Sequence, residues 1–146
     1  MSAEDTLRPL LTFRLATQHY ALAIEQVLEV AAMVAVTTMP DAPPEIFGLA
    51  NRHGAVLPII DLRKVFRLPA ADLTVSTMFI VADVNNQQIG LLVDEVFQVK
   101  YTIEGALKPT HGAGRYVTHI VSDGDTVFQL IDVTPLLATY LAEKEL

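Results

Sequence analysis

The sequence contains no cysteine and no tryptophan, and only 7% of its 146 residues are aromatic. Without cysteine the chain can form neither a disulfide nor a thiolate metal site, which suits a reducing compartment. Charged residues are sparse, at 18%, and the formal net charge is -7. An acidic chain with no cluster of lysine or arginine is a poor ligand for nucleic acids and for anionic membranes. We therefore expect no nucleic-acid partner.

No apolar run in the sequence is long enough to cross a membrane. The most apolar stretch, residues 23–36, is interrupted by Glu25 and Glu29, whereas a spanning helix needs about 18 uninterrupted apolar residues. Residues 1–10 are acidic and have no hydrophobic region of the secretory type. We expect a cytoplasmic protein without direct membrane insertion.

The motifs that carry catalysis are also missing. There is no G-x-S-x-G elbow, no Walker glycine loop, no G-x-G-x-x-G and no H-E-x-x-H. None of the four histidines has another histidine four residues away, so no metal or other cofactor is expected. An arrangement of His111 or His119 with an aspartate would still lack a nucleophile motif. The sequence therefore predicts no enzymatic activity.

What is present is a series of short apolar strands separated by turns, which is typical of small β-barrels. Half of the residues are hydrophobic, which indicates a large buried core. Helices are few. Asp61 is expected to cap a short helix that runs to Phe66, and Thr134 with Pro135 to open a C-terminal helix over residues 134–146. Three hairpins are predicted. The first joins strands 10–15 and 20–24, the second joins strands 77–84 and 88–93, and the third joins strands 117–121 and 126–131.

The two halves of the chain resemble each other. Residues 56–66 (VLPIIDLRKVF) recur as residues 127–137 (VFQLIDVTPLL), and residues 24–30 recur at nearly the same offset as residues 93–99. Asp61 and Asp132 occupy equivalent places, so a capping role explains both. The repeat predicts two subdomains, at residues 10–67 and 73–133, that exchange strands or simply pack together to bury their apolar faces.

Residues 39–66 are similar to the signature of CheW-like domains, the bacterial chemotaxis coupling proteins. That signature is roughly Pro-x-x-Pro, then Gly-x-x-Asn-x-Arg-Gly, then Pro-x-x-Asp-Leu. Further family elements match before and after this stretch, and the resemblance covers about residues 8–141. The matching residues are Val27, Glu29, Pro40, Pro43, Gly48, Asn51, Gly54, Pro58, Asp61, Leu62, Gly90, Val93, Asp94, Val96 and Val99.

The resemblance implies a mainly β fold of two SH3-like five-stranded barrels packed together, with a C-terminal helix and short helical turns. It also implies an adaptor without enzymatic activity. Members of this family couple the cytoplasmic tip of methyl-accepting chemoreceptors to a CheA-type histidine kinase, through the kinase's CheW-like regulatory domain. Such a protein would be recruited from the cytoplasm to receptor arrays at the membrane.

By position, the resemblance assigns seven residues to the receptor-binding groove, while the kinase-binding residues stay unknown. The family usually has Arg directly before the signature glycine, whereas this chain has His53 there and Arg52 one place earlier. If this segment is extended, neighbouring side chains point to opposite sides, so Arg52 would not replace the missing arginine. The assigned residues are Val27, Glu29, Asn51, Arg52, His53, Val96 and Val99.

Three other interpretations stay open. The valines of the groove are equally compatible with an ordinary hydrophobic core. The segment 111–115 (HGAGR), together with Arg52 and His53, could form an anion site in a double barrel that binds a small ligand. The adaptor could also serve a chemosensory system for motility that does not use flagella.

Overall fold

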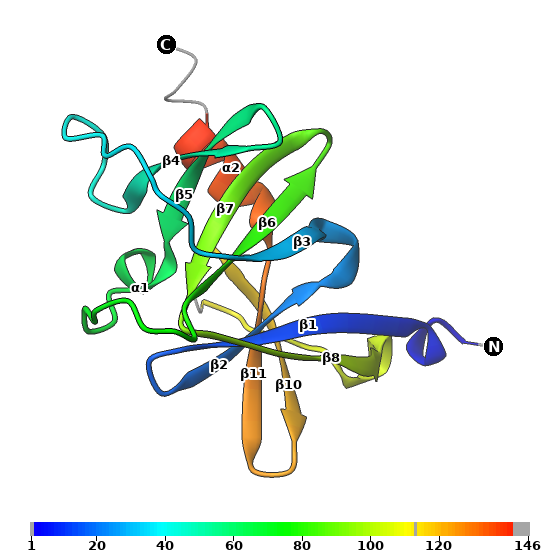
Figure 1. The fold of residues 1–146 in the computed structure, drawn as a ribbon. Helices are drawn as coiled ribbons and strands as arrows, with labels where there is room; N and C mark the ends of the chain where they lie inside the picture. The colour runs from blue at the N-terminus through cyan, green and yellow to red at the C-terminus, as the bar shows by residue number, and fades with distance from the viewer. Residues whose placement is uncertain (1, 113, 142–146) are drawn as a thin grey trace.

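A computed structural model of the protein describes residues 2–112 and 114–141. Two mixed β-sheets contain nearly all of the regular structure, and one lies above the other in the view of Figure 1. The first sheet has the order β8 (Glu95–Ile103), β1 (Leu7–Leu15), β2 (Gln18–Ala23), β11 (Thr126–Ile131), β10 (Val117–Asp123) and β9 (Lys108–Pro109). The second sheet has the order β3 (Val27–Ala32), β6 (Met78–Val84), β7 (Gln87–Val93), β5 (Ala55–Asp61) and β4 (Ile46–Arg52).

Each sheet takes strands from both sequence repeats. The strands β1 to β5 of the first repeat have counterparts at nearly constant spacing in the second, namely β6, β7, β8, β10 and β11. Replacing every strand by its counterpart converts the order of one sheet into the order of the other, apart from the short β9. The first hairpin of each repeat thus completes the sheet of the other repeat. For this reason the predicted boundary at residues 68–72 does not coincide with the division between the sheets.

The strand registers follow the same internal symmetry. Leu22 of β2 lies opposite Ile131 of β11, and Leu91 of β7 lies opposite Ile60 of β5, in both cases in a parallel pair. A short backbone bridge closes each sheet. Thr37 and Leu49 exchange two hydrogen bonds of 2.8 Å in one sheet, and the pair of Lys108 with Ile120 occupies the equivalent place in the other. We call the closed first sheet barrel A and the closed second sheet barrel B.

Consecutive apolar residues of the strands point into different cores, because side chains alternate across a strand. Leu10 lies inside barrel A and Ile59 inside barrel B, whereas their neighbours Leu11 and Ile60 pack in a shared core between the barrels. The largest core is the shared one, and α2 (Val133–Leu141) contributes to it. The barrels therefore bury their outer faces against each other, and the predicted fold class is confirmed.

The turns and helix starts agree with the sequence in most details. All three predicted hairpins form, and Asn85 and Asn86 both adopt positive φ in the turn between β6 and β7. Asp61 Oδ1 accepts a hydrogen bond of 3.0 Å from the Arg63 amide at the start of α1 (Leu62–Val65). Besides α1 and α2, single helical turns occur at η1 (Ala3–Asp5), η2 (Ile24–Gln26) and η3 (Glu104–Ala106).

The predicted start of the C-terminal helix is wrong by one residue. The helix begins at Val133 rather than at Thr134, and it is capped by Asp132, as the equivalence with Asp61 predicted, rather than by Thr134. The carboxylate of Asp132 accepts a hydrogen bond of 3.0 Å from the Thr134 amide, which satisfies an amide of the first turn better than a threonine hydroxyl further along. The predicted part of this helix beyond residue 141 lies outside the described residues.

Candidate protein-docking site

The turn between β4 and β5 displays His53 to solvent. Both His53 and Gly54 have positive φ, at 53° and 85°, so the two residues form a tight turn rather than an extended segment. Asn51 Oδ1 accepts a hydrogen bond of 3.1 Å from the Gly54 amide and so orders this turn. The expectation of an extended chain at residues 52–53 is wrong, because β4 ends at Arg52.

The side chains of Arg52 and His53 point in different directions because of their contacts, and not because of strand alternation. Arg52 turns inward and forms an ion pair with Glu29, with Nη2 2.5 Å and Nε 3.0 Å from Oε1. Its guanidinium also lies 5.5 Å from the centre of the Phe79 ring, in the interior of barrel B. His53 stays 79% exposed, with Nε2 3.8 Å from the same glutamate oxygen. Thus His53, not Arg52, is the outward-facing side chain of this turn.

The ion pair connects the first and last strands in the order of barrel B, since Glu29 belongs to β3 and Arg52 to β4. The hydrogen bond from Arg52 holds the pKa of Glu29 below its usual range. The carboxylate therefore stays charged over the whole neutral range.

The three predicted groove valines come from both barrels. Val27 begins β3 of barrel B, while Val96 and Val99 belong to β8 of barrel A. All three are partly buried and pack against the shared core. Each contributes to packing and still keeps surface at the seam where the barrels meet. The structure thus brings Glu29, Arg52 and His53 into one cluster, and places the valines at the seam.

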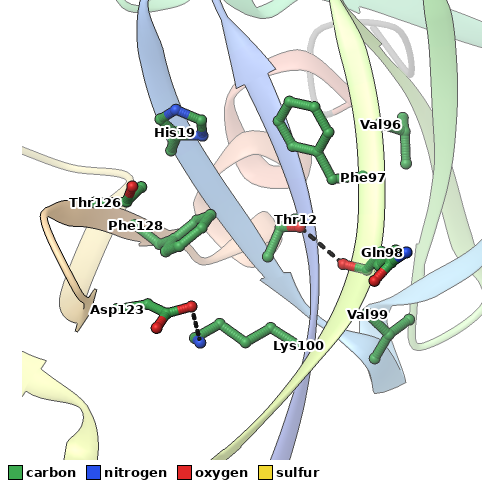
Figure 2. A pocket seen from close by; sticks show the side chains of 10 residues that line it. All are labelled: Thr12, His19, Val96, Phe97, Gln98, Val99, Lys100, Asp123, Thr126 and Phe128. Carbon is green, nitrogen blue, oxygen red and sulfur yellow. Dashed lines mark hydrogen bonds and ion pairs between the residues drawn. The ribbon is translucent and has the colours of Figure 1, made fainter.

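A cleft of about 860 Å³ opens beside this seam on barrel A. His19 stacks on Phe97, with ring centres 5.8 Å apart, and meets Phe128 edge-on at 5.4 Å. Lys100 forms an ion pair of 2.8 Å with Asp123 at the rim. Apart from Val96 and Val99, the sequence did not indicate the residues of this cleft, because they converge only when β2, β8 and β11 share one sheet. The lining residues in Figure 2 are Thr12, His19, Val96, Phe97, Gln98, Val99, Lys100, Asp123, Thr126 and Phe128.

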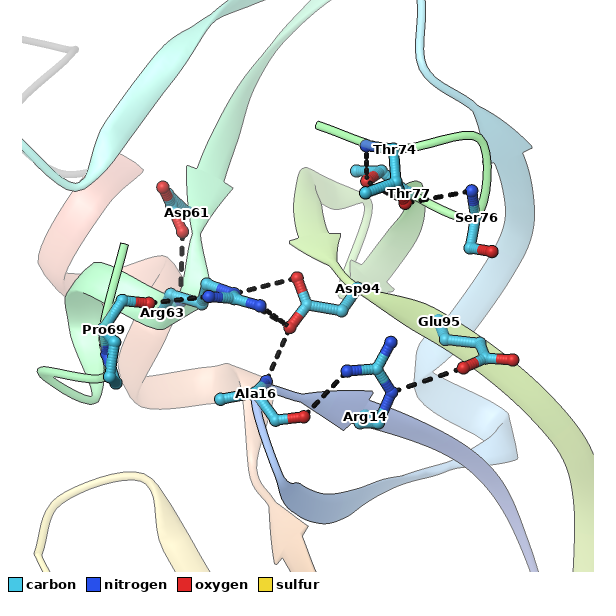
Figure 3. A network of polar contacts seen from close by, with 10 residues as sticks. All are labelled: Arg14, Ala16, Asp61, Arg63, Pro69, Thr74, Ser76, Thr77, Asp94 and Glu95. Carbon is cyan, nitrogen blue, oxygen red and sulfur yellow. Dashed lines mark hydrogen bonds and ion pairs between the residues drawn. The ribbon is translucent and has the colours of Figure 1, made fainter. Parts of the chain in front are cut away.

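A network of polar contacts fixes the point where the chain passes from barrel B into β8 (Figure 3). Asp94 accepts hydrogen bonds of 2.8 Å from Arg63 Nε to both of its oxygens, and one of 2.6 Å from the amide of Ala16. Arg63 Nη1 donates to the carbonyl of Pro69 at 2.6 Å. The network therefore connects α1 and the turn between β1 and β2 with the residue that precedes Glu95 and the rest of β8.

Two of the side chains predicted for an anion site have partners within the protein. Arg52 pairs with Glu29, and Arg115 Nη1 donates to the hydroxyl of Thr139 at 3.5 Å. Among residues 2–112 and 114–141, no three His, Asp or Glu side chains gather in a way that could hold a metal ion. The same residues include no helix that is both long and apolar enough to cross a bilayer.

Two strand-exchanged small barrels that meet along a partly apolar seam, beside charged and aromatic surface, define a double-barrel protein-interaction module. The model of the CheW-like domain family matches residues 9–140. The chain belongs to this family, and the resemblance found in the sequence is confirmed. The family consists of scaffolding and adaptor proteins rather than enzymes.

Similar proteins occur in several bacteria. The chemotaxis protein CheW of Rhizobium meliloti (strain 1021) is 37% identical over 103 residues, which are 70% of this chain and 66% of the relative, just under two thirds of its length. The chemotaxis protein CheW of Bacillus subtilis (strain 168) is 28% identical and covers 94% of this chain and 92% of its own. The solved scaffolding protein TtCheW from Thermoanaerobacter tengcongensis matches with a TM-score of 0.80 and 29% identity, over 86% of this chain and 88% of that one.

Proposed function

We propose that this protein is a non-enzymatic adaptor that couples the cytoplasmic tip of a chemoreceptor to a CheA-type histidine kinase. The kinase would be bound through its own CheW-like regulatory domain, and the adaptor would work in the cytoplasm, at the receptor array. Membership of the CheW-like domain family, over residues 9–140, is the observation that carries this proposal. The chemotaxis names of the relatives support it.

The receptor groove is proposed at the seam between the barrels. Val27, Val96 and Val99 form its apolar floor, since each is only partly buried. An apolar groove with few charges suits an amphipathic helical hairpin, because little charge must be desolvated on binding. The cluster of Glu29, Asn51, Arg52 and His53 would form its polar flank.

The proposal has a direct test. The protein is mixed with the regulatory domain of the cognate kinase and, separately, with a receptor-tip fragment. Calorimetry and size-exclusion chromatography should show a complex in both cases, without chemical conversion of either partner. Absence of binding to both partners would overturn the proposal.

A single substitution separates a groove residue from a core residue. We expect Val96→Arg to abolish binding of the receptor tip while the melting temperature stays within a few degrees of wild type, because the new side chain can extend from the seam into water. Val127→Arg, an exposed valine on β11, is the matched control and should leave binding unchanged. A collapsed melt of Val96→Arg would place this valine in the core, because an unpaired buried charge is costly.

A chemosensory system for motility without flagella is a second setting for the same adaptor. It is favoured by one relative that does not bear a chemotaxis name, the protein FrzA of Myxococcus xanthus, which is 25% identical over 87% of this chain. Deletion of the gene in its host, followed by assays of swimming and of surface migration, distinguishes the two settings.

A further inference from the structure

Four apolar cross-strand pairs follow one another along β1 and β8. Residues directly opposite in an antiparallel pair project from the same face, so each pair forms one rung of a ladder. A bulge between Leu11 and Phe13 keeps Val96 on the face that Val99 shares, since both valines pack against the core between the barrels. We call this ladder the apolar track. Its pairs are Phe13 with Val96, Leu11 with Val99, Pro9 with Tyr101, and Leu7 with Ile103.

The inner half of the apolar track is covered by the molecule itself, and the outer half is not. Phe13 and Leu11 are buried in the core between the barrels. In contrast, Tyr101 is 72% exposed, Leu7 58% and Ile103 41%. Large apolar side chains that stand together on a surface, continuous with a packed core, mark an interaction site more strongly than scattered ones.

The dimensions of the apolar track fit a helix. From Val96 to Ile103 the strand advances seven residues, or about 23 Å at ~3.3 Å per residue. Four turns of an α-helix span about the same length, at 5.4 Å per turn. The inner end of the track carries Val96 and Val99 of the proposed receptor groove. A helix seated in that groove would therefore continue over Tyr101 and Ile103.

The charged side chains near the outer end of the apolar track lie on the opposite face of the strand pair. Glu104 follows Ile103 directly, and Arg8 bridges it to Glu25, with 4.0 Å between Arg8 Nη2 and the Glu25 carboxylate. Two carboxylates against one guanidinium leave one net negative charge. Because Arg8 alternates with Leu7 and Pro9 along β1, this cluster faces away from the track, and the track itself presents apolar side chains.

We propose that the apolar track is the outer part of the receptor-binding surface, where it seats the apolar face of an amphipathic α-helix of the receptor tip. This inference rests on the proposed function. It adds Leu7, Tyr101 and Ile103 to the docking surface, and these residues are not part of the family signature in this sequence.

The test uses exposed residues, whose replacement spares the fold. Tyr101→Ser with Ile103→Thr should weaken binding of a purified receptor-tip fragment at least tenfold, with an unchanged melting temperature. Binding of the kinase regulatory domain should stay the same. Val127→Thr, equally exposed on a different strand, should change neither affinity.

Three results would overturn the inference. Wild-type protein could bind the receptor tip while the double variant binds it equally well, which removes the apolar track but leaves the proposed function intact. Sedimentation could show that the wild type self-associates through the track and the variant does not, which makes a second copy the occupant. Failure of the wild type to bind either the receptor tip or the kinase domain would remove the proposed function itself.

Discussion

Among single residues, the pair of Glu29 with Arg52 makes part of the stability depend on pH. The pKa of Glu29 is lower in the folded protein than its ordinary value of about 4.3. A lowered pKa contributes stability above the unfolded value, and this contribution is lost as the pH falls through the folded value. We therefore expect the difference in melting temperature between wild type and Glu29→Gln to be largest near neutral pH and to shrink steadily below pH 4.

Thermal melts between pH 3 and pH 7 measure this difference. Glu4→Gln is the control, because Glu4 forms no ion pair within the described part of the chain and should show no such trend. A constant difference for Glu29→Gln across the whole range would contradict the role of the charge pair.

The ion pair of Asp94 with Arg63 should contribute more to the free energy of unfolding than the other ion pairs do. Arg63 and Asp94 are only 15% and 18% exposed, and the Ala16 amide would lose its acceptor if Asp94 were shortened. We expect Asp94→Ala to lower the free energy of unfolding by about 3 kcal/mol, since it leaves a largely buried guanidinium without its partner. Lys100→Ala breaks an ion pair whose Asp123 is 63% exposed, and should cost no more than about 1 kcal/mol.

Urea unfolding of the two variants gives both values. Equal losses for Asp94→Ala and Lys100→Ala would contradict the special position of Asp94 at the entry to β8.

The residues that could be predicted from the sequence are those that act on their near neighbours. Asn51, Asp61 and Asp132 each bond to an amide two or three residues away, so their turn and capping roles follow from local sequence. The partner of Arg52 lies 23 residues away and is reached only when β3 and β4 close barrel B. The same reason explains why the sequence did not identify Glu29 as the partner of Arg52.

At the scale of strands, Gly90 allows β7 to lie close beside β5. A Cβ atom at this position would stand 2.3 Å from Ile59 Cδ1 and 3.2 Å from the Phe79 ring. We expect Gly90→Ala to destabilise the protein by about 2 kcal/mol through this overlap. Ile59→Val alone should cost about 1 kcal/mol, because it leaves a small cavity.

The double variant Gly90→Ala, Ile59→Val tests whether the new methyl group at residue 90 occupies the space of the Ile59 side chain. Valine lacks the Cδ1 atom that the new methyl group would meet, so the double variant should lose less stability than the sum of the single losses. Chemical denaturation of the three variants gives the coupling. Simple additivity would mean that backbone effects, and not the contact with Ile59, set the cost of Gly90→Ala.

The strands and their hairpin partners were predicted well, whereas the pairings between the two halves of the chain were not. Alternation of apolar residues and turn-forming residues locates the hairpins, because both signals are local. The parallel pair of β2 with β11 joins segments from opposite ends of the chain, and no local pattern indicates it. Even so, the repeat supplied the essential constraint, since it showed that whatever pairing one half makes has an equivalent in the other.

For the whole molecule, the exchange of strands predicts that neither repeat can fold as a monomer by itself. A fragment of residues 1–72 lacks β6 and β7, which lie between β3 and β5 in barrel B. Leu22 would lose Ile131 and Ile60 would lose Leu91, so the fragment could not build the shared core either. Domains of this size are already marginal when they bury their full share of surface.

We expect fragments 1–72 and 73–146 each to show no cooperative thermal transition as monomers, and an equimolar mixture to regain the circular dichroism spectrum and a single transition. Sedimentation measured in parallel separates a monomer from a dimer in which two copies of one fragment exchange hairpins, since the equivalent strand orders permit that exchange. A folded monomer of either fragment would show that each repeat completes its own barrel. In that case the seam, and with it the proposed receptor groove, would be a contact between two independent units rather than a consequence of how the chain is threaded.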